Sequence, residues 1–75
     1  MISPLETLRT YTLGMRVEGV AELLDMPTYQ YELAEEGREE IETHKLMPLQ
    51  EFGINVNTLA KEQHEWMQWR GRVAA

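Results

Sequence analysis

The sequence predicts an all-α fold, a small bundle of about four helices with short loops, formed by residues 1–75 as a single helical domain. Three observations predict it. Apolar residues recur at spacings of three and four in several segments. Residues that cap helices precede these segments, and Pro27 and Pro48 interrupt them. No segment alternates between apolar and polar residues for long, and no Asn-Gly or Asp-Gly turn joins two β-branched runs.

The first predicted helix begins after Ser3. Ser3 can cap it, Pro4 suits its first position because a missing N–H costs nothing there, and Glu6 completes a capping box. We expect this helix to end or bend at Gly14. A second helix, roughly Arg16 to Met26, follows it and carries an apolar stripe made of Val17, Val20, Ala21 and Leu24.

Pro27 forbids a straight continuation of the second helix, so the chain must turn there. We expect Thr28 to cap a third helix, about Tyr29 to Leu46, which Gly37 could split in two and which Met47-Pro48 ends. After one short helical turn closed by Gly53, Asn55 or Asn57 can cap a final helix to about Arg70. The predicted core comprises Leu5, Leu8, Val17, Val20, Leu24, Leu33, Ile41, Phe52, Ile54, Leu59 and Trp66.

Composition narrows the class of protein. Seventy-five residues without cysteine exclude disulfides and thiolate metal sites, so we expect self-association or a partner protein to add stability. The net charge of −6 repels nucleic acid and anionic lipid, which makes nucleic-acid partners unfavourable. The N-terminus lacks the pattern of a signal peptide, and no apolar stretch could span a bilayer. We therefore expect a cytoplasmic protein without a membrane partner.

Candidate catalytic residues are few. The two histidines, His44 and His64, stand near Glu40 and Glu65, but neither the Glu-x-x-His pairs nor the His-Glu-x-x-His motif of metal sites is present. Surface ion pairs explain these histidines. The one serine, Ser3, is explained as a helix cap, and the glycines are too scattered for a phosphate loop. The sequence thus predicts no enzyme, no cofactor and no metal.

The acidic segment from Glu32 to Glu42 is one candidate partner-binding surface. On one helix its carboxylates would form a negative face able to engage a basic partner, or to imitate a nucleic-acid backbone. The alternative is a solvated face that serves solubility, partly neutralised by Arg38 and Lys45. The predicted contact residues here are Glu32, Glu35, Glu36, Glu39 and Glu40.

The C-terminal helix carries the second candidate surface. Trp66, Met67, Trp69 and Arg70 are of the types enriched where proteins meet. The alternative is that both tryptophans fill the domain's own core. Because they are three residues apart they cannot point in quite the same direction, so we expect one of them to lie in an interface, either with a second copy or with another protein.

Residues 17–37 carry a family resemblance. The run Val17–Met26, then Pro27–Tyr31 and Glu35-Glu36-Gly37, resembles the helix-turn-helix of excisionase and MerR-like regulators. In that pattern Ala21 is the small residue packed inside the first helix, Met26 follows the turn, and the second helix ends near Gly37. The resemblance implies DNA binding. The sequence departs from it in the second helix, which carries Glu32, Glu35 and Glu36 and no lysine or arginine for phosphate contacts.

These observations predict a non-catalytic protein–protein interaction protein. It would be a small adaptor, assembly factor or stoichiometric inhibitor that docks a helical surface on a larger protein and forms a homodimer. Small proteins of this kind are common in phages and mobile elements, which suggests such a source. The alternative is a degenerate helix-turn-helix transcriptional regulator.

Overall fold

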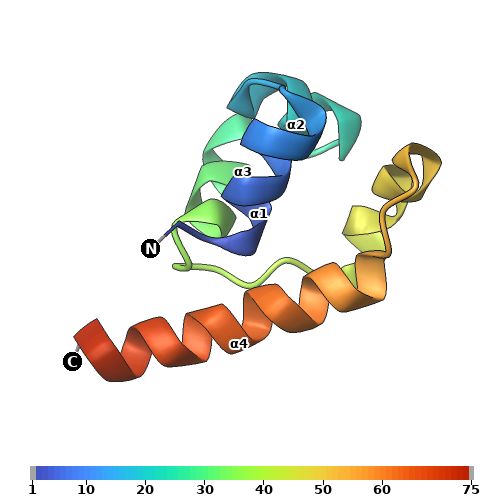
Figure 1. Cartoon of the computed structure of the whole chain (residues 1–75). Helices are drawn as coiled ribbons and strands as arrows, with labels where there is room; N and C mark the ends of the chain where they lie inside the picture. Colours follow the sequence, from blue (N-terminus) through green and yellow to red (C-terminus); the bar gives the residue numbers. More distant parts are fainter. Residues whose placement is uncertain (1, 75) are drawn as a thin grey trace.

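A computed structural model describes residues 2–74, with side chains to residue 71, and every regular element in that range is helical. In chain order they are α1 (Pro4–Thr7), η1 (Leu8–Leu13), α2 (Val17–Leu23), α3 (Thr28–Glu35), η2 (Thr43–Phe52) and α4 (Val56–Ala74). The prediction of a small helical bundle is confirmed. Figure 1 shows the long α4 running past the group formed by α1, α2 and α3.

The N-terminal helix begins and ends where the sequence predicts. The Ser3 hydroxyl accepts a hydrogen bond from the backbone N–H of Glu6 at 3.1 Å, so Ser3 is the cap. α1 continues directly into η1, whose wider π-helical turns end at Gly14. Gly14 has a φ of 61°, a left-handed conformation that glycine adopts without steric cost.

α2 and α3 form a pair of short helices joined by Leu24–Pro27. Asp25 takes the left-handed conformation with a φ of 55°, which aspartate tolerates better than most residues. The next N–H, from Met26, donates to the Ala21 carbonyl at 3.0 Å and closes the turn. Thr28 is the first residue of α3 and Pro27 takes the cap position, so the predicted Thr28 cap was wrong.

The prediction of one helix to Leu46 was also wrong, although the break that the sequence left open at Gly37 is confirmed. α3 ends at Glu35, and Gly37 follows with a φ of 78°. A Cβ at Gly37 would lie 2.6 Å from a ring carbon of Trp66, so only glycine lets α4 pack this closely against the end of α3. A separate 3₁₀ segment, η2, begins at Thr43 and runs through Pro48 rather than ending there. Burial of Leu46 and Leu49 on either side of Pro48 outweighs the hydrogen bond that proline cannot make.

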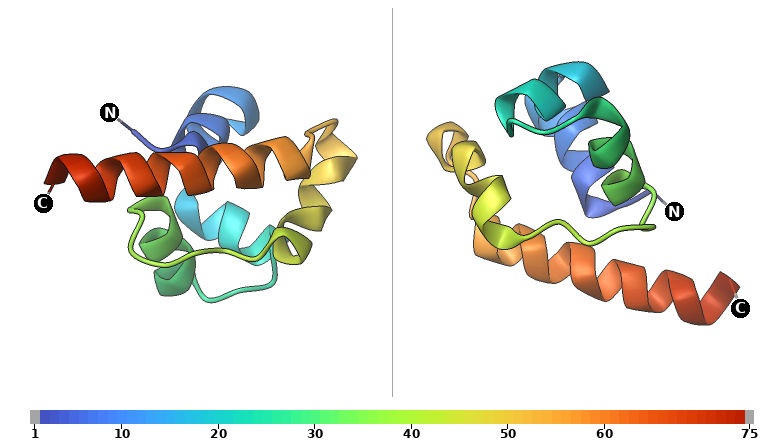
Figure 2. Two further views of the ribbon diagram at one scale, coloured as in Figure 1. Left: turned by 90° about the horizontal axis from the view of Figure 1, so that it is seen from below. Right: turned by 180° about the vertical axis from the view of Figure 1, so that it is seen from behind.

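α4 crosses beside the N-terminal helices and holds them together (Figure 2). The Asn55 side chain accepts from the N–H of Thr58 at 3.1 Å, which identifies Asn55 as the cap. Gln63 is buried between three helices. Its Oε1 accepts from the N–H of Leu5 at 3.2 Å, and its Nε2 donates to the Ala34 carbonyl at 2.9 Å. Both ends of one amide therefore tie α1 and α3 to α4.

The core agrees in part with the predicted set. Leu5, Val20, Leu24, Leu59 and Trp66 are buried. A second group packs partly buried against the core: Leu8, Val17, Ile41 and Ile54. Leu33 is only half-buried, and Phe52, the last residue of η2, is exposed. Core residues absent from the prediction are Ala21, Met26, Tyr31, Ala34, Leu46, Leu49 and Val56.

Candidate functional site: the α2–α3 unit and a groove along α4

A largely buried ion pair connects α3 to η1. The Arg9 guanidinium on η1 makes two hydrogen bonds to the Glu35 carboxylate, Nε to Oε2 at 2.6 Å and Nη2 to Oε1 at 3.2 Å. Its Nη1 donates to the Met15 carbonyl at 3.1 Å, in the segment that leads into α2. One arginine therefore connects η1, the approach to α2, and the end of α3.

The electrostatics of Arg9 follow from this contact. The hydrogen bond to Glu35 raises the pKa of the Arg9 guanidinium, against the opposing effect of burial, so Arg9 stays charged. Burial, together with the Glu35 carboxylate nearby, raises the pKa of the Tyr31 phenol and keeps it neutral. Glu35 is only 7% exposed and therefore does not belong to the exposed acidic surface on which the sequence analysis placed it.

The exposed side of α3 is mixed in character. Its first turn carries uncharged hydrogen-bonding side chains at Thr28, Tyr29 and Gln30, of which Tyr29 is 69% exposed. Glu32 is exposed farther along the helix. A small cleft beside α3 is lined by Gln30 and Lys45 together with three carboxylates, those of Glu39, Glu40 and Glu42.

The remaining predicted acidic residues lie in a turn and an extended segment rather than on one helix, and several have a partner. Glu36 pairs with Arg38 at 3.3 Å, and Glu42 pairs with His44 at 3.1 Å. Glu40 contacts His64 Nδ1 at 2.6 Å, which links this segment to α4. Both histidines thus lie in exposed contacts with a glutamate side chain. Among residues 2–74 no three histidine, aspartate or glutamate side chains come together in a cluster able to hold a metal ion.

The two tryptophans of α4 point into different surroundings. Trp66 is 9% exposed, its indole N–H is buried without a hydrogen-bond partner in the described part of the chain, and the Arg70 guanidinium lies 5.7 Å from the ring centroid. Trp69 remains 46% exposed. Met67 lies in a different hollow, beside His64 and Ile41. The predicted cluster of Trp66, Met67, Trp69 and Arg70 is therefore divided between two sides of α4.

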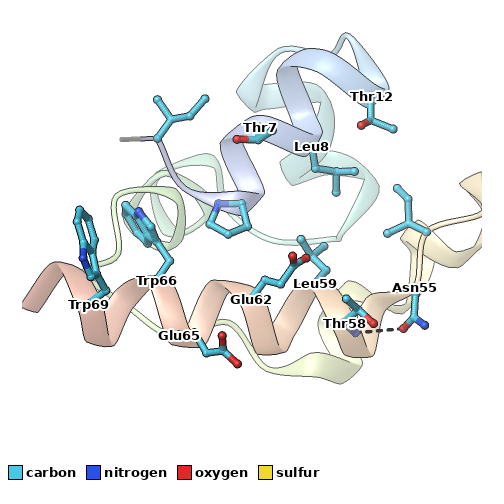
Figure 3. Close-up of a pocket in the computed structure, with 13 residues that line it drawn as sticks. Thr7, Leu8, Thr12, Asn55, Thr58, Leu59, Glu62, Glu65, Trp66 and Trp69 are labelled. Carbon is cyan, nitrogen blue, oxygen red and sulfur yellow. Dashed lines mark hydrogen bonds between the residues drawn. The ribbon is translucent and has the colours of Figure 1, made fainter.

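A groove of about 960 Å³ runs between α4 and the N-terminal helix (Figure 3). Apolar side chains form much of its surface, and Glu62 and Glu65 of α4 also line it. The full lining is Ile2, Pro4, Thr7, Leu8, Thr12, Ile54, Asn55, Thr58, Leu59, Glu62, Glu65, Trp66 and Trp69. Sequence reasoning missed this groove because its two walls are separated by more than forty residues of chain.

These features define the class as a small all-helical protein with an α2–turn–α3 unit of helix-turn-helix size. Comparison with known protein families, with curated proteins and with solved structures finds no match. Within the described residues, no helix is both long enough and apolar enough to cross a membrane.

Proposed function

We propose that this chain is a helix-turn-helix domain that recognises double-stranded DNA through the first turn of α3. The observation that carries the proposal is the α2–turn–α3 unit itself, held at a fixed position by the Arg9–Glu35 pair and closed by a left-handed residue at Asp25. In domains of this kind the N-terminal residues of the second helix contact base edges in the major groove.

The distribution of charge on α3 supports this proposal better than the sequence alone did. Glu35 is neutralised in the interior by Arg9, and Glu36 pairs with Arg38 beyond the end of the helix. The first turn of α3 is free of acid, and the Gln30 amide is of the type that pairs with adenine in the major groove. The Tyr29 hydroxyl can also donate and accept hydrogen bonds there.

Few basic side chains of the protein are available to contact DNA phosphates. Arg16 is exposed at the start of α2, the helix that crosses the DNA backbone in this geometry, and Lys45 lies near Gln30. Because the chain carries a net charge of −6, we expect weak non-specific binding and a shallow dependence of affinity on salt. Replacing Arg16 by alanine should lower the slope of log affinity against log salt by about one.

Selection from a pool of random duplexes at about 50 mM salt tests the proposal. We expect one short sequence to be enriched, and Gln30→Ala to weaken binding to that sequence by about 5- to 150-fold, equivalent to about 1–3 kcal/mol. Tyr11→Ala is the control, because Tyr11 is 76% exposed and lies on η1 rather than on α2 or α3. A pool that shows no enrichment with folded protein contradicts DNA recognition.

The second candidate function is non-catalytic binding to a larger protein, as an adaptor, assembly factor or inhibitor. The groove between α1 and α4 favours it, because Ile2 and Trp69 are apolar side chains exposed at 44% and 46%. Capture of a partner by the tagged chain, lost in Trp69→Ala and retained in Gln30→Ala, would support this function. Capture that survives Trp69→Ala would contradict docking at this groove.

A further inference from the structure

The groove between α4 and the N-terminal helix has the length of a short helix. Its lining follows one face of α4 from the cap Asn55 to Trp69, and at about 1.5 Å of rise per residue this face is about 21 Å long (Figure 3). Trp69 on α4 and Ile2 on the N-terminal side are each nearly half exposed. A helix of about four turns matches this length.

The groove offers an occupant side-chain contacts rather than a strand to pair with. Every regular element in residues 2–74 is helical, so this part of the chain has no sheet edge to which an extended peptide could add. A helix satisfies most of its own backbone hydrogen bonds, and it fills an apolar groove with side chains spaced three and four residues apart. The groove therefore fits the apolar face of an amphipathic helix.

The charge of the groove indicates which amphipathic helix fits. Glu62 points into the groove and Glu65 lies at its outer edge (Figure 3). Both are exposed, neither has an ion-pair partner among residues 2–71, and no basic side chain of those residues lines the groove. An uncharged partner would take these carboxylates out of water without compensation, which weakens binding. Basic side chains at the edge of a partner helix would offset that loss.

The same two carboxylates disfavour other occupants. A second copy that presented the same face would bring its own Glu62 and Glu65 against those of the first, and like charges opposed across an interface weaken binding. Nucleic acid and anionic lipid are repelled for the same reason.

We propose that the groove binds an amphipathic helix of a partner protein, with apolar side chains on one face and lysine or arginine beside that face. The inference rests on the second candidate function, for which it names the chemistry of the partner. It does not depend on DNA recognition, because no residue that lines the groove belongs to α2 or α3.

Selection from a displayed library of helical peptides, each about 16 residues long, tests the proposal. The library fixes leucine and alanine on one helical face and randomises the positions that flank it, and the folded wild-type chain is the bait at physiological salt. We expect lysine and arginine to be enriched at the flanking positions. Enrichment of acidic or uncharged residues there, or no enrichment at all, would overturn the proposal.

Fluorescence anisotropy of a labelled peptide from the selection then locates its binding site. Glu62→Gln combined with Glu65→Gln should weaken binding at least about threefold. The matched control is Glu18→Gln combined with Glu22→Gln, which makes the same change of net charge at exposed positions on α2 and should alter binding less than about twofold. Equal losses in the two double variants would show that only net charge attracts the peptide, and the proposal would fall.

Trp69→Ala should weaken binding of the same peptide at least about tenfold. Phe52→Ala is the matched control, because Phe52 is an aromatic residue 51% exposed on η2 and outside the groove. Circular dichroism checks that each variant is folded. A wild-type chain that sediments as a dimer and is dissociated by Trp69→Ala would assign the groove to a second copy and overturn the proposal.

The failure of this inference can be told apart from the failure of the function on which it rests. A partner whose capture is lost in Trp69→Ala, from a chain that selects no basic peptide, would leave the second candidate function standing and overturn only the basic helix. Capture that survives Trp69→Ala, together with no selected peptide, would overturn both.

Discussion

Replacing Arg9 by methionine should remove a large part of the stability of this protein. The change deletes all three hydrogen bonds of the guanidinium and leaves the Glu35 carboxylate without its cation at a site where only 7% of the residue is exposed. Breaking a buried ion pair from one side costs about 3–5 kcal/mol. A chain of this length has a free energy of unfolding of about 4–11 kcal/mol, so the loss is about half of it.

Urea denaturation followed by circular dichroism and tryptophan fluorescence measures this loss. The double variant Arg9→Met with Glu35→Leu removes both charges, so we expect it to be more stable than Arg9→Met alone. The matched control is Arg38→Met, which breaks the exposed pair with Glu36 and should cost less than about 1 kcal/mol. If the free energy of unfolding of Arg9→Met lies within about 1 kcal/mol of the wild-type value, the ion pair does not hold α3 in place.

Three further predictions concern the packing around α3 and α4. Gln63→Ala should lower the free energy of unfolding by about 1–3 kcal/mol, measured in urea, because it leaves the buried N–H of Leu5 without a partner and removes one of the two hydrogen bonds to the Ala34 carbonyl. Gly37→Ala should destabilise more than Gly53→Ala; both positions have a φ of 78°, but only at Gly37 does the new Cβ meet the Trp66 ring. The pKa of the Tyr31 phenol is raised above its ordinary value of 10.0, so the folded state favours the neutral phenol. Its contribution to the free energy of unfolding is therefore complete below pH 10 and is lost as pH rises above 10. Urea titrations between pH 8 and 11 should show this decline, and Tyr31→Phe should reduce it.

Local signals predicted three helix ends. Ser3, Gly14 and Asn55 act as the sequence indicates, because caps and left-handed glycines depend on neighbours within four residues. The predicted helix to Leu46 was wrong because α3 ends at Glu35 and the following Gly37 packs against Trp66, which is distant in the chain. In this region tertiary packing outweighs helix propensity, and the residues after Gly37 form an extended segment although several of them favour helices.

The candidate sites required the fold for the same reason. No local pattern pairs Arg9 with Glu35, which are 26 residues apart, so Glu35 was grouped with the exposed acids. The burial of Gln63 could have been predicted from its spacing, since Gln63 falls on the same helical face as the core residues Leu59 and Trp66. One of the two tryptophans was expected in an interface, and Trp69 is the one whose side chain is exposed.

Nuclear magnetic resonance titration with the selected duplex tests the central claim, that the first turn of α3 reads DNA. The account predicts that the largest shifts occur in the amides of Thr28–Leu33 and at Arg16, and that the amides lining the α4 groove move little. Shifts confined to α4, or no shifts in a folded protein at millimolar duplex, would contradict it.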